Sequence, residues 1–280
     1  MKTRIITALV AICVLVPVLI LSNTWVLPIA AAFCSALAVF EMLRCCGLHK
    51  KYVLSVPLVA VGTIASLSVR LFDAFGSLLT YAVPVLIALV FYFLALMVFS
   101  KGKISVEDIS VASFTSFYIA FAFVALLALR YYEAMGAYTY ILIFIGAWIT
   151  DIFAYFCGML FGKHKLIPEV SPKKTVEGSV GGILFCGLSF ILYGVILKYG
   201  LQVQFDVNYI QLFCYGVAAS VVSQIGDLSM SAIKRRYGIK DFGKIFPGHG
   251  GMLDRFDSIL AVSSVLFILN EISGVFTVIG

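Results

Sequence analysis

The sequence has few charged residues. Only 12% of its 280 residues are Asp, Glu, Lys or Arg, whereas 62% are hydrophobic. Soluble globular domains average about 45–50% apolar and 25% charged residues, so this composition excludes an ordinary soluble domain. Apolar runs of the roughly 18 residues needed to cross a bilayer recur along the chain, and no segment between them is long enough for a separate globular domain. We therefore expect an all-α, polytopic transmembrane bundle, because helices satisfy their own backbone hydrogen bonds in lipid.

Several motifs of soluble enzymes are also missing. The chain has no Gly-x4-Gly-Lys-Ser/Thr segment and no Gly-x-Gly-x-x-Gly segment between a strand and a helix, which excludes the common soluble phosphate-binding loops. None of its seven cysteines forms a Cys-x-x-Cys pair, so we interpret them as small apolar residues. A metal site at Cys45, Cys46 and His49 is the less favoured alternative, because metal ligands usually have wider spacing.

About nine membrane spans are predicted from the apolar runs. The first begins after Lys2 and Arg4 and has features of a signal peptide, but its apolar run is long and no Ala-x-Ala-like site follows, which favours a retained helix. The predicted spans cover about 5–21, 25–40, 52–72, 78–99, 109–129, 138–161, 179–198, 209–231 and 258–278.

The basic residues give an independent indication of topology. With nine spans, 17 of the 20 basic residues fall on one side of the membrane, and only Arg70, Arg130 and Lys198 fall on the other. Because cytoplasmic loops carry an excess of Lys and Arg, this distribution predicts a cytoplasmic N-terminus. It also places two polar loops, about 162–178 and 232–257, on the cytoplasmic face.

Two aspartates lie within or at the end of apolar spans. A carboxylate there costs several kcal/mol, about 2.5–3.5 on insertion scales, so Asp151 and Asp227 are functional candidates. The alternative is that each simply pairs with Lys or Arg at the membrane surface. If the segment around Asp227 is helical, Ser223, Asp227, Ser231 and Lys234 share one face. Carboxylates and hydroxyls suit Mg²⁺, and a lysine suits phosphate.

A glycine-rich segment follows this helix. Three glycines within four positions surround His249, and such backbones approach ligands closely and direct amides at anions. Asp254 and Asp257 come next and would share a helical face. Together with Asp227 they supply enough carboxylates for one or two metal ions.

The combination of these features resembles a known family. The pattern is Ser231-x-x-Lys234-Arg235-x4-Lys240-Asp241-x-Gly243-x3-Pro247-Gly248-His249-Gly250-Gly251-x-x-Asp254-Arg255-x-Asp257. It resembles the signature of the phosphatidate cytidylyltransferase (CDP-diglyceride synthetase) family. An upstream block, from Trp148 through Asp151 to Ser171-Pro-Lys173-Lys174-Thr-x-Glu-Gly178, is similar to that family's second conserved block. The resemblance is strong over about residues 145–260.

The resemblance implies transfer of a cytidylyl group from CTP to phosphatidic acid, with Mg²⁺ in one or two sites. For this reaction our hypothesis is that Asp227 and Asp254 hold the metal, and that Asp257, Ser231 and His249 support catalysis. The phosphates would be held by Lys173, Lys174, Lys234, Arg235, Lys240, Arg255, Gly250 and Gly251. Asp151, Ser171, Ser223 and Asp241 are further candidates.

Two other functions stay open from the residues. A related CTP-using membrane enzyme, such as a CDP-archaeol synthase or a polyprenol kinase, would share the metal and phosphate groups but take another lipid. A transporter would also use intramembrane carboxylates, although here the acidic residues cluster on one face with cations. The Asp-Gly-x-x-Ala-Arg pattern of CDP-alcohol phosphotransferases is absent.

These features predict two functional regions in one membrane unit. Residues 1–140 form a transmembrane scaffold and residues 141–280 form the catalytic region with both cytoplasmic loops. Gly158-x3-Gly162 favours close helix packing, within one chain or in a homodimer. The net charge of +6 suits anionic lipids and nucleotides, and no nucleic-acid partner is expected. The resemblance implies a bacterial inner membrane protein, and the distribution of basic residues predicts an active site on the cytoplasmic face.

Overall fold

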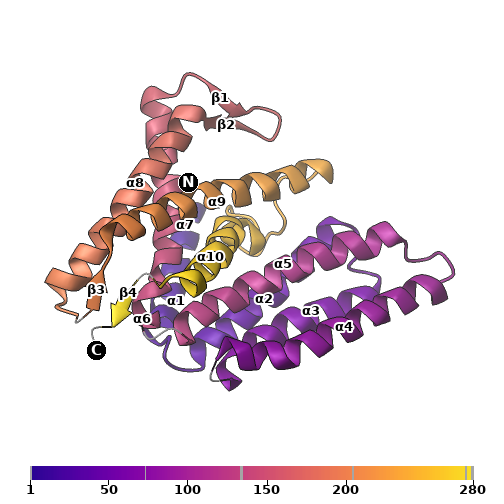
Figure 1. Ribbon diagram of the computed structural model, residues 1–280. Coiled ribbons are helices and arrows are strands. Elements are labelled where there is room, and N and C mark those ends of the chain that lie inside the picture. Colours follow the sequence, from indigo (N-terminus) through magenta and orange to yellow (C-terminus); the bar gives the residue numbers. More distant parts are fainter. Residues whose placement is uncertain (1, 73, 133–134, 204, 275, 279–280) are drawn as a thin grey trace. The chain divides into compact units, whose positions relative to one another are not determined.

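The chain folds into helices joined by short connections. The computed structural model describes residues 2–72, 74–132, 135–203, 205–274 and 276–278, shown in Figure 1. Most of these residues are helical, which confirms the predicted all-α class. By internal contacts the chain divides into two compact units. The first contains Met1–Ala128 and Asp241–Asp254, and the second contains Leu129–Lys240 and Arg255–Gly280.

The first unit is built from long apolar helices. Its elements are α1 (Lys2–Ile20), α2 (Val26–Cys45), α3 (Tyr52–Ser68), the 3-10 helix η1 (Val69–Leu71), α4 (Phe75–Phe99) and most of α5 (Val106–Tyr131). Helices α2 and α3 pack closely at Gly62. A Cβ atom there would lie only 2.8 Å from Ser35 Oγ, so the close approach requires glycine. Only 6% of the apolar window of α4 is buried, as expected for a helix that faces lipid.

The second unit is also helical, with two small hairpins. Its elements are α6 (Gly136–Thr139), α7 (Ile141–Phe161), β1 (Lys165–Ile167), β2 (Ser171–Thr175), α8 (Val176–Val195), the π-helix η2 (Ile196–Gly200), β3 (Phe205–Val207), α9 (Tyr209–Arg236), α10 (Leu253–Ile272) and β4 (Phe276–Val278). Strands β1 and β2 pair antiparallel, as do β3 and β4. Figure 1 shows the β1–β2 hairpin beyond the adjoining ends of α7 and α8.

Among the described residues, seven helices are long and apolar enough to span a membrane. They are Val26–Cys45, Tyr52–Leu71, Phe75–Phe99, Val106–Tyr131, Gly136–Phe161, Val176–Gly200 and Tyr209–Arg236. The chain is therefore an integral membrane protein. The first and last of the nine predicted spans correspond to α1, whose described apolar part is Leu9–Ile20, and to α10, which carries more charge. The last predicted span, 258–278, extends past the end of α10 at Ile272. Val275 lies outside the described residues, and Phe276–Val278 form strand β4 and not the predicted helix.

Helix ends differ from the predicted loop limits. Helix α9 continues to Arg236 and α10 begins at Leu253, so the connection between them is shorter than the predicted loop 232–257. The predicted loop 162–178 contains the β1–β2 hairpin and the first turn of α8. The orientation of the spans and the functional division at residue 140 stay predictions.

Glycines allow the helices of the second unit to approach each other. A Cβ atom at Gly216 in α9 would lie 2.7 Å from the Cα of Gly187 in α8. A Cβ atom at Gly158 would lie 2.8 Å from Thr175 Oγ1, and one at Gly162 would lie 2.8 Å from Thr175 Cγ2. The Gly158-x3-Gly162 pattern thus serves packing within the chain.

Substitution of Gly216 tests this packing. Gly216→Ala forces a backbone shift between α8 and α9, and we expect it to destabilise the protein by about 1–3 kcal/mol, as other overpacked sites do. Gly76→Ala is the matched control, because nothing lies within 4 Å of a Cβ atom there. Thermal unfolding in detergent measures both variants, and equal melting temperatures would contradict the prediction.

Candidate active site

The β1–β2 hairpin is anchored to the start of α8. Thr175 caps the helix, because its Oγ1 accepts a hydrogen bond from the backbone N–H of Gly178 at 3.1 Å. Glu177 accepts a hydrogen bond from the backbone N–H of Lys163 at 3.1 Å and lies 2.6 Å from His164 Nδ1. These contacts fix both ends of the hairpin, and they set the position of Lys173 and Lys174 on β2.

Lys174 and Asp227 form an ion pair between β2 and α9. Both side chains are about three-quarters buried, with 23% and 26% of their surface exposed. On the next turn of α9, Ser231 Oγ donates a hydrogen bond to Asp227 Oδ1 at 3.4 Å. Lys173, which precedes Lys174, is exposed instead. The structure therefore distinguishes two lysines that the sequence presents as a pair.

Three carboxylates of the second unit act on each other electrostatically. Asp227 acts on both Asp151 and Asp257, and Asp151 also acts on Asp257. Gly226 brings α9 and α10 together here, because a Cβ atom on it would lie 2.9 Å from the backbone oxygen of Asp257. We call Asp151, Asp227 and Asp257 the acidic cluster. Cations surround this cluster, namely Lys174, Lys234 and Arg255.

The acidic cluster fits Mg²⁺ in the chemistry of its donors. Magnesium prefers carboxylate, hydroxyl and water oxygens, and Asp227 with Ser231 supplies the first two. Among the described residues, no three His, Cys, Asp or Glu side chains converge as a ready metal site. Asp227 instead has Lys174 as its partner. The residues therefore have the donor atoms that Mg²⁺ prefers, but these atoms are not arranged as a coordination shell.

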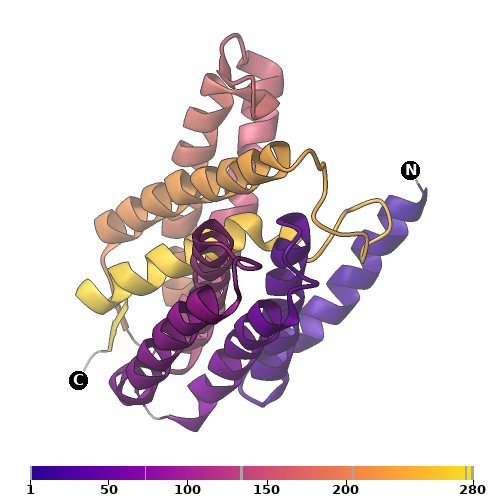
Figure 2. The same ribbon diagram turned by 90° about the vertical axis from the view of Figure 1, so that its right-hand side faces the viewer.

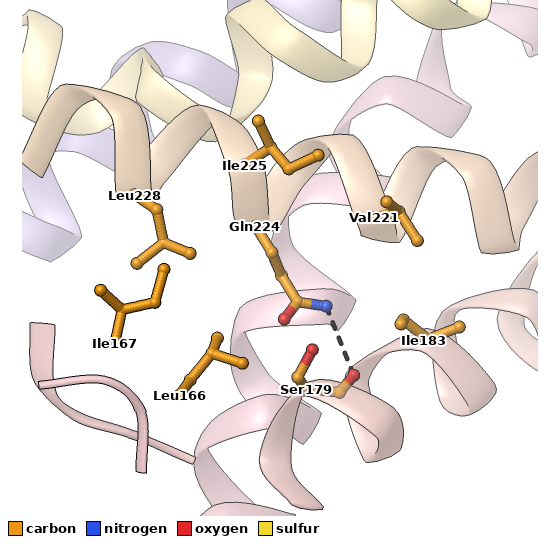
Figure 3. A pocket seen from close by; sticks show the side chains of 8 residues that line it. All are labelled: Leu166, Ile167, Ser179, Ile183, Val221, Gln224, Ile225 and Leu228. Carbon is orange, nitrogen blue, oxygen red and sulfur yellow. Dashed lines mark hydrogen bonds between the residues drawn. The ribbon is translucent and has the colours of Figure 1, made fainter. Parts of the chain in front are cut away.

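An apolar pocket lies beside the acidic cluster. It has a volume of about 210 Å³ and is lined by Leu166, Ile167, Ser179, Ile183, Val221, Gln224, Ile225 and Leu228. Figure 3 shows the residues of β1 and of helices α8 and α9 pointing toward each other around this space. Gln224 Nε2 donates to the backbone oxygen of Ser179 at 3.3 Å, and its amide is the main polar group of the wall.

The glycine-rich segment, residues 241–252, belongs to the first unit. The backbone N–H of His249 donates to Phe246 O at 2.9 Å, across a corner formed by Pro247 and Gly248. Gly248 and Gly250 have φ angles of 77° and 90°, which L-residues with side chains rarely adopt. Proline followed by glycine with positive φ is typical of a type II turn. Gly248 and Gly250 are thus needed for the backbone path.

Two carboxylates hold this segment. Asp254 Oδ2 accepts hydrogen bonds from the backbone N–H groups of Phe242, at 2.8 Å, and Gly251, at 2.9 Å. Glu41 Oε2 on α2 accepts from the backbone N–H of Leu253 at 2.9 Å. At the outer corner, Thr7 of α1 donates to Pro247 O at 3.1 Å, and Figure 2 shows the segment passing beside α1.

Glu41 and Arg44 are residues that the sequence reasoning did not select. The predicted second span ended at residue 40, one position before Glu41. The signal was present, because Glu41 is a lone acid in an apolar run, like Asp151 and Asp227. Arg44, one turn later, donates from Nη2 to Phe242 O at 2.6 Å. In the sequence it is only one of the basic residues predicted on the cytoplasmic side.

The other predicted residues have varied surroundings. Ser223 is fully buried, and its Oγ makes no hydrogen bond within the described part of the chain. His249 Nδ1 is also buried without a hydrogen-bond partner among the described residues. Lys234 is buried at 8% exposure, whereas Arg235, Lys240 and Asp241 are exposed. Ser171 begins β2, three residues before Lys174.

Comparison with known sequences shows the family of this chain. A sequence model described as "Cytidylyltransferase family" matches residues 2–273, nearly the whole chain. The chain belongs to the cytidylyltransferase family. Its similar relatives include proteins named phosphatidate cytidylyltransferase from Staphylococcus haemolyticus (34% identical over 270 residues), Staphylococcus saprophyticus (36% over 273) and Staphylococcus aureus strain COL (36% over 273). Each alignment covers 96% of this chain and 98% of the relative. The resemblance found in the sequence motifs is thereby confirmed over residues 2–273 of this chain.

The different environments of Lys173 and Lys174 can be measured directly. We expect an amine-reactive reagent to label exposed Lys173 faster than Lys174, because Lys174 is mostly buried and paired with Asp227. In Asp227→Asn the pair is broken, and labelling of Lys174 should rise while that of Lys173 stays constant. Mass spectrometry of the labelled peptides quantifies both lysines. Equal labelling of the two in the unmodified sequence would contradict the pairing.

Proposed function

We propose that this cytidylyltransferase-family chain transfers the cytidylyl group of CTP to phosphatidic acid, releasing pyrophosphate and forming CDP-diacylglycerol. The observation that carries the proposal is the acidic cluster with its surrounding cations, in a chain that matches the family over residues 2–273. Phosphatidate cytidylyltransferases that align with 96% of the chain support the choice of lipid. A carboxylate cluster among lysines suits a substrate that brings phosphates to a metal ion.

The reaction joins two polyanions. A phosphate oxygen of phosphatidic acid forms a bond to the α-phosphorus of CTP, and the bond from that phosphorus to the bridging oxygen of pyrophosphate breaks. Pyrophosphate leaves with the electron pair. The attacking phosphate is already anionic, so the chain need not supply a strong base. The main obstacles are charge repulsion and orientation, which cations fixed in a preorganised site reduce.

The cations of the chain have distinct positions for this task. Lys174 and Lys234 are mostly buried near the acidic cluster, and Arg255 acts on Asp151 from α10. We assign these three to the phosphates closest to the reacting atoms. The exposed cations Lys173, Arg235 and Lys240 would attract the polyanions at the surface, together with Ser171 on β2. Gly250 and Gly251 would place backbone amides against phosphate oxygens, and His249 would hydrogen-bond one of them.

Mg²⁺ is the cofactor that we propose. Asp227 and Asp254 are its proposed ligands, with Ser231 and Asp257 in support and Asp151, Ser223 and Asp241 as further candidates; these assignments allow one or two ions. When bound, the ion would neutralise phosphate charge and stabilise the leaving pyrophosphate. Asp254 has a second task, because its Oδ2 accepts the backbone N–H groups of Phe242 and Gly251.

The apolar pocket would take part of an acyl chain of the lipid substrate. Its wall includes Leu228, which follows Asp227 on α9, and Ile167 on the hairpin that carries Lys174. A lipid whose phosphate meets Lys174 has its acyl chains within reach of this wall. The membrane would provide the remaining space that the substrates need. It would also hold the two chains of any homodimer. We place the protein in a bacterial inner membrane with its site on the cytoplasmic face, where 17 of 20 basic residues lie by the predicted topology.

Purified protein in detergent tests the function. We expect labelled CTP to enter chloroform-soluble product only with phosphatidic acid and Mg²⁺, with matching release of pyrophosphate, and excess EDTA to stop it. Asp227→Asn should lower the rate by about 100-fold or more, as loss of a group that contacts the transition state does. Lys174→Met should have a similar effect.

The matched controls are exposed residues of the same type. Asp206→Asn, whose side chain is 72% exposed, and Lys103→Met, at an exposed lysine outside the proposed site, should each retain activity within about threefold, since exposed charges contribute little. Turnover of another phospholipid, but not phosphatidic acid, would overturn the proposed substrate. Near-normal activity of Asp227→Asn would overturn its assignment to the metal.

The acyl pocket has its own test. Ile183→Trp would fill the pocket, and we expect it to lower kcat/KM about tenfold for dioleoyl phosphatidic acid but little for the dihexanoyl lipid, in the range of hydrophobic-pocket discrimination. Ile210→Trp is the matched control, because Ile210 on α9 is 79% exposed and outside the pocket. Equal losses for both lipids would show that the pocket does not bind the acyl chain.

A further inference from the structure

Glu41 is a buried carboxylate to which the proposed reaction assigns no role. It lies four residues before the end of α2, within a candidate membrane span, and only 1% of its surface is exposed. Ionisable side chains in such a span are costly to bury, so they are usually retained for a specific contact. Its Oε1 makes no hydrogen bond within the described part of the chain. A purely structural role in helix packing would be served better by an apolar side chain.

The contacts of Glu41 are concentrated on the glycine-rich segment. Its Oε2 accepts the backbone N–H of Leu253, at the first residue of α10. A Cβ atom at Gly251 would lie 2.6 Å from Glu41 Cδ, and one at Gly243 would lie 2.8 Å from the same atom. The carboxylate thus occupies the space that side chains at both positions would need. The Glu41 side chain therefore leaves room only for glycine at positions 243 and 251, whatever the backbone turn itself requires.

The neighbouring groups complete a frame around the segment. Arg44 binds Phe242 O at 2.6 Å, one residue before Gly243. Asp254 Oδ2 binds the N–H groups of Phe242 and Gly251, and a Cβ atom at Gly250 would lie 2.7 Å from that same oxygen. Both ends of the segment are therefore fixed by side chains that contact its backbone, two of them from α2.

We propose that Glu41 is a positioning residue, which fixes the backbone of residues 242–253 so that the amides of Gly250 and Gly251 and the side chain of His249 face the substrate phosphates. Their contact with phosphate rests on the function proposed above. The positioning itself does not, because it is a property of the chain without substrate. Glu41 acts through the backbone and not by contact with the reacting atoms.

Three variants separate positioning from folding. Glu41→Leu is close in size and removes the acceptor for Leu253. Glu41→Gln keeps an acceptor oxygen and the shape. Ser35→Ala is the matched control, because Ser35 is fully buried on the same helix, but lies against Gly62 of α3 and not against the glycine-rich segment.

Hydrogen exchange of the full chain in detergent, without substrate, is the first measurement. We expect amides of residues 250–254 to exchange at least about tenfold faster in Glu41→Leu than in the unmodified protein, as local opening does. Exchange there should be unchanged in Glu41→Gln and Ser35→Ala, and exchange of α7 should be unchanged in all three. Unaltered protection of residues 250–254 in Glu41→Leu would overturn the proposal. Faster exchange throughout the chain would also overturn it, because Glu41 would then act on global stability.

CTP incorporation is the second measurement. Glu41→Leu should lose about tenfold or more in kcat/KM, and Glu41→Gln should recover to within about threefold, since misplacement of binding groups by an ångström has effects of this size or more. Equal loss in both variants would overturn the positioning role. If the exchange result holds but the unmodified protein makes no lipid product, then the proposed reaction fails while the role of Glu41 in fixing the segment stands.

A double-mutant cycle tests the contact with Gly243. Gly243→Ala should impair the unmodified protein, because its new Cβ atom meets the Glu41 carboxylate. In the Glu41→Ala background the same change should have a smaller effect on the exchange of residues 250–254, since the carboxylate is gone and only the Cα of Gly251, 2.8 Å from the new Cβ atom, still obstructs it. Gly76→Ala, with open space around its Cβ position, should be additive with Glu41→Ala. Full additivity of Gly243→Ala would contradict the contact.

Discussion

A carboxylate inside an apolar helix bundle needs a partner, and this requirement determines where the chain's polar elements lie. Leaving a buried charge uncompensated costs several kcal/mol, more than most single contacts contribute. Asp227 meets the requirement through Lys174, which brings the β1–β2 hairpin to α9. Glu41 and Asp254 meet it through backbone N–H groups, which bring the glycine-rich segment to the ends of α2 and α10. The polar loops are therefore positioned by charges that belong to the helices.

Glycine makes these arrangements sterically available. At Gly226 the absence of a side chain brings the backbone of Asp257 close to α9, which concentrates negative charge between two helices. At Gly251 the same absence leaves room for the Glu41 carboxylate beside the backbone. These two glycines thus allow charged groups to approach the backbone closely, which is a role apart from backbone flexibility. A side chain at either position would separate charges that the fold holds together.

Much of this could be predicted from the sequence, because the strongest signals in it are local. Apolar runs predicted the helices, and the spacing of Asp227 and Ser231 predicted the shared face of α9 on which the two side chains hydrogen-bond. The roles of Glu41 and Arg44 could not be predicted, since their partners lie about 200 residues away along the chain. Likewise, no local pattern separates Lys173 from Lys174. Their difference arises because successive side chains of β2 point to opposite faces, and the position of Asp227 on α9 decides which lysine is paired.

The Lys174–Asp227 pair has a further consequence for the proposed reaction. In the protein alone, each group neutralises the other, so the charges that the chemistry needs are stabilised without substrate. In the proposed site, an incoming phosphate would offer Lys174 another anion, and a divalent cation would offer Asp227 another counterion. Binding of the substrate and the metal would then replace the Lys174–Asp227 pair with a Lys174–phosphate pair and an Asp227–metal pair. Little charge would be left unpaired at any stage. In a low-dielectric surrounding, where an isolated charge is most costly, this exchange lets an apolar bundle hold an active site for polyanions without losing its stability.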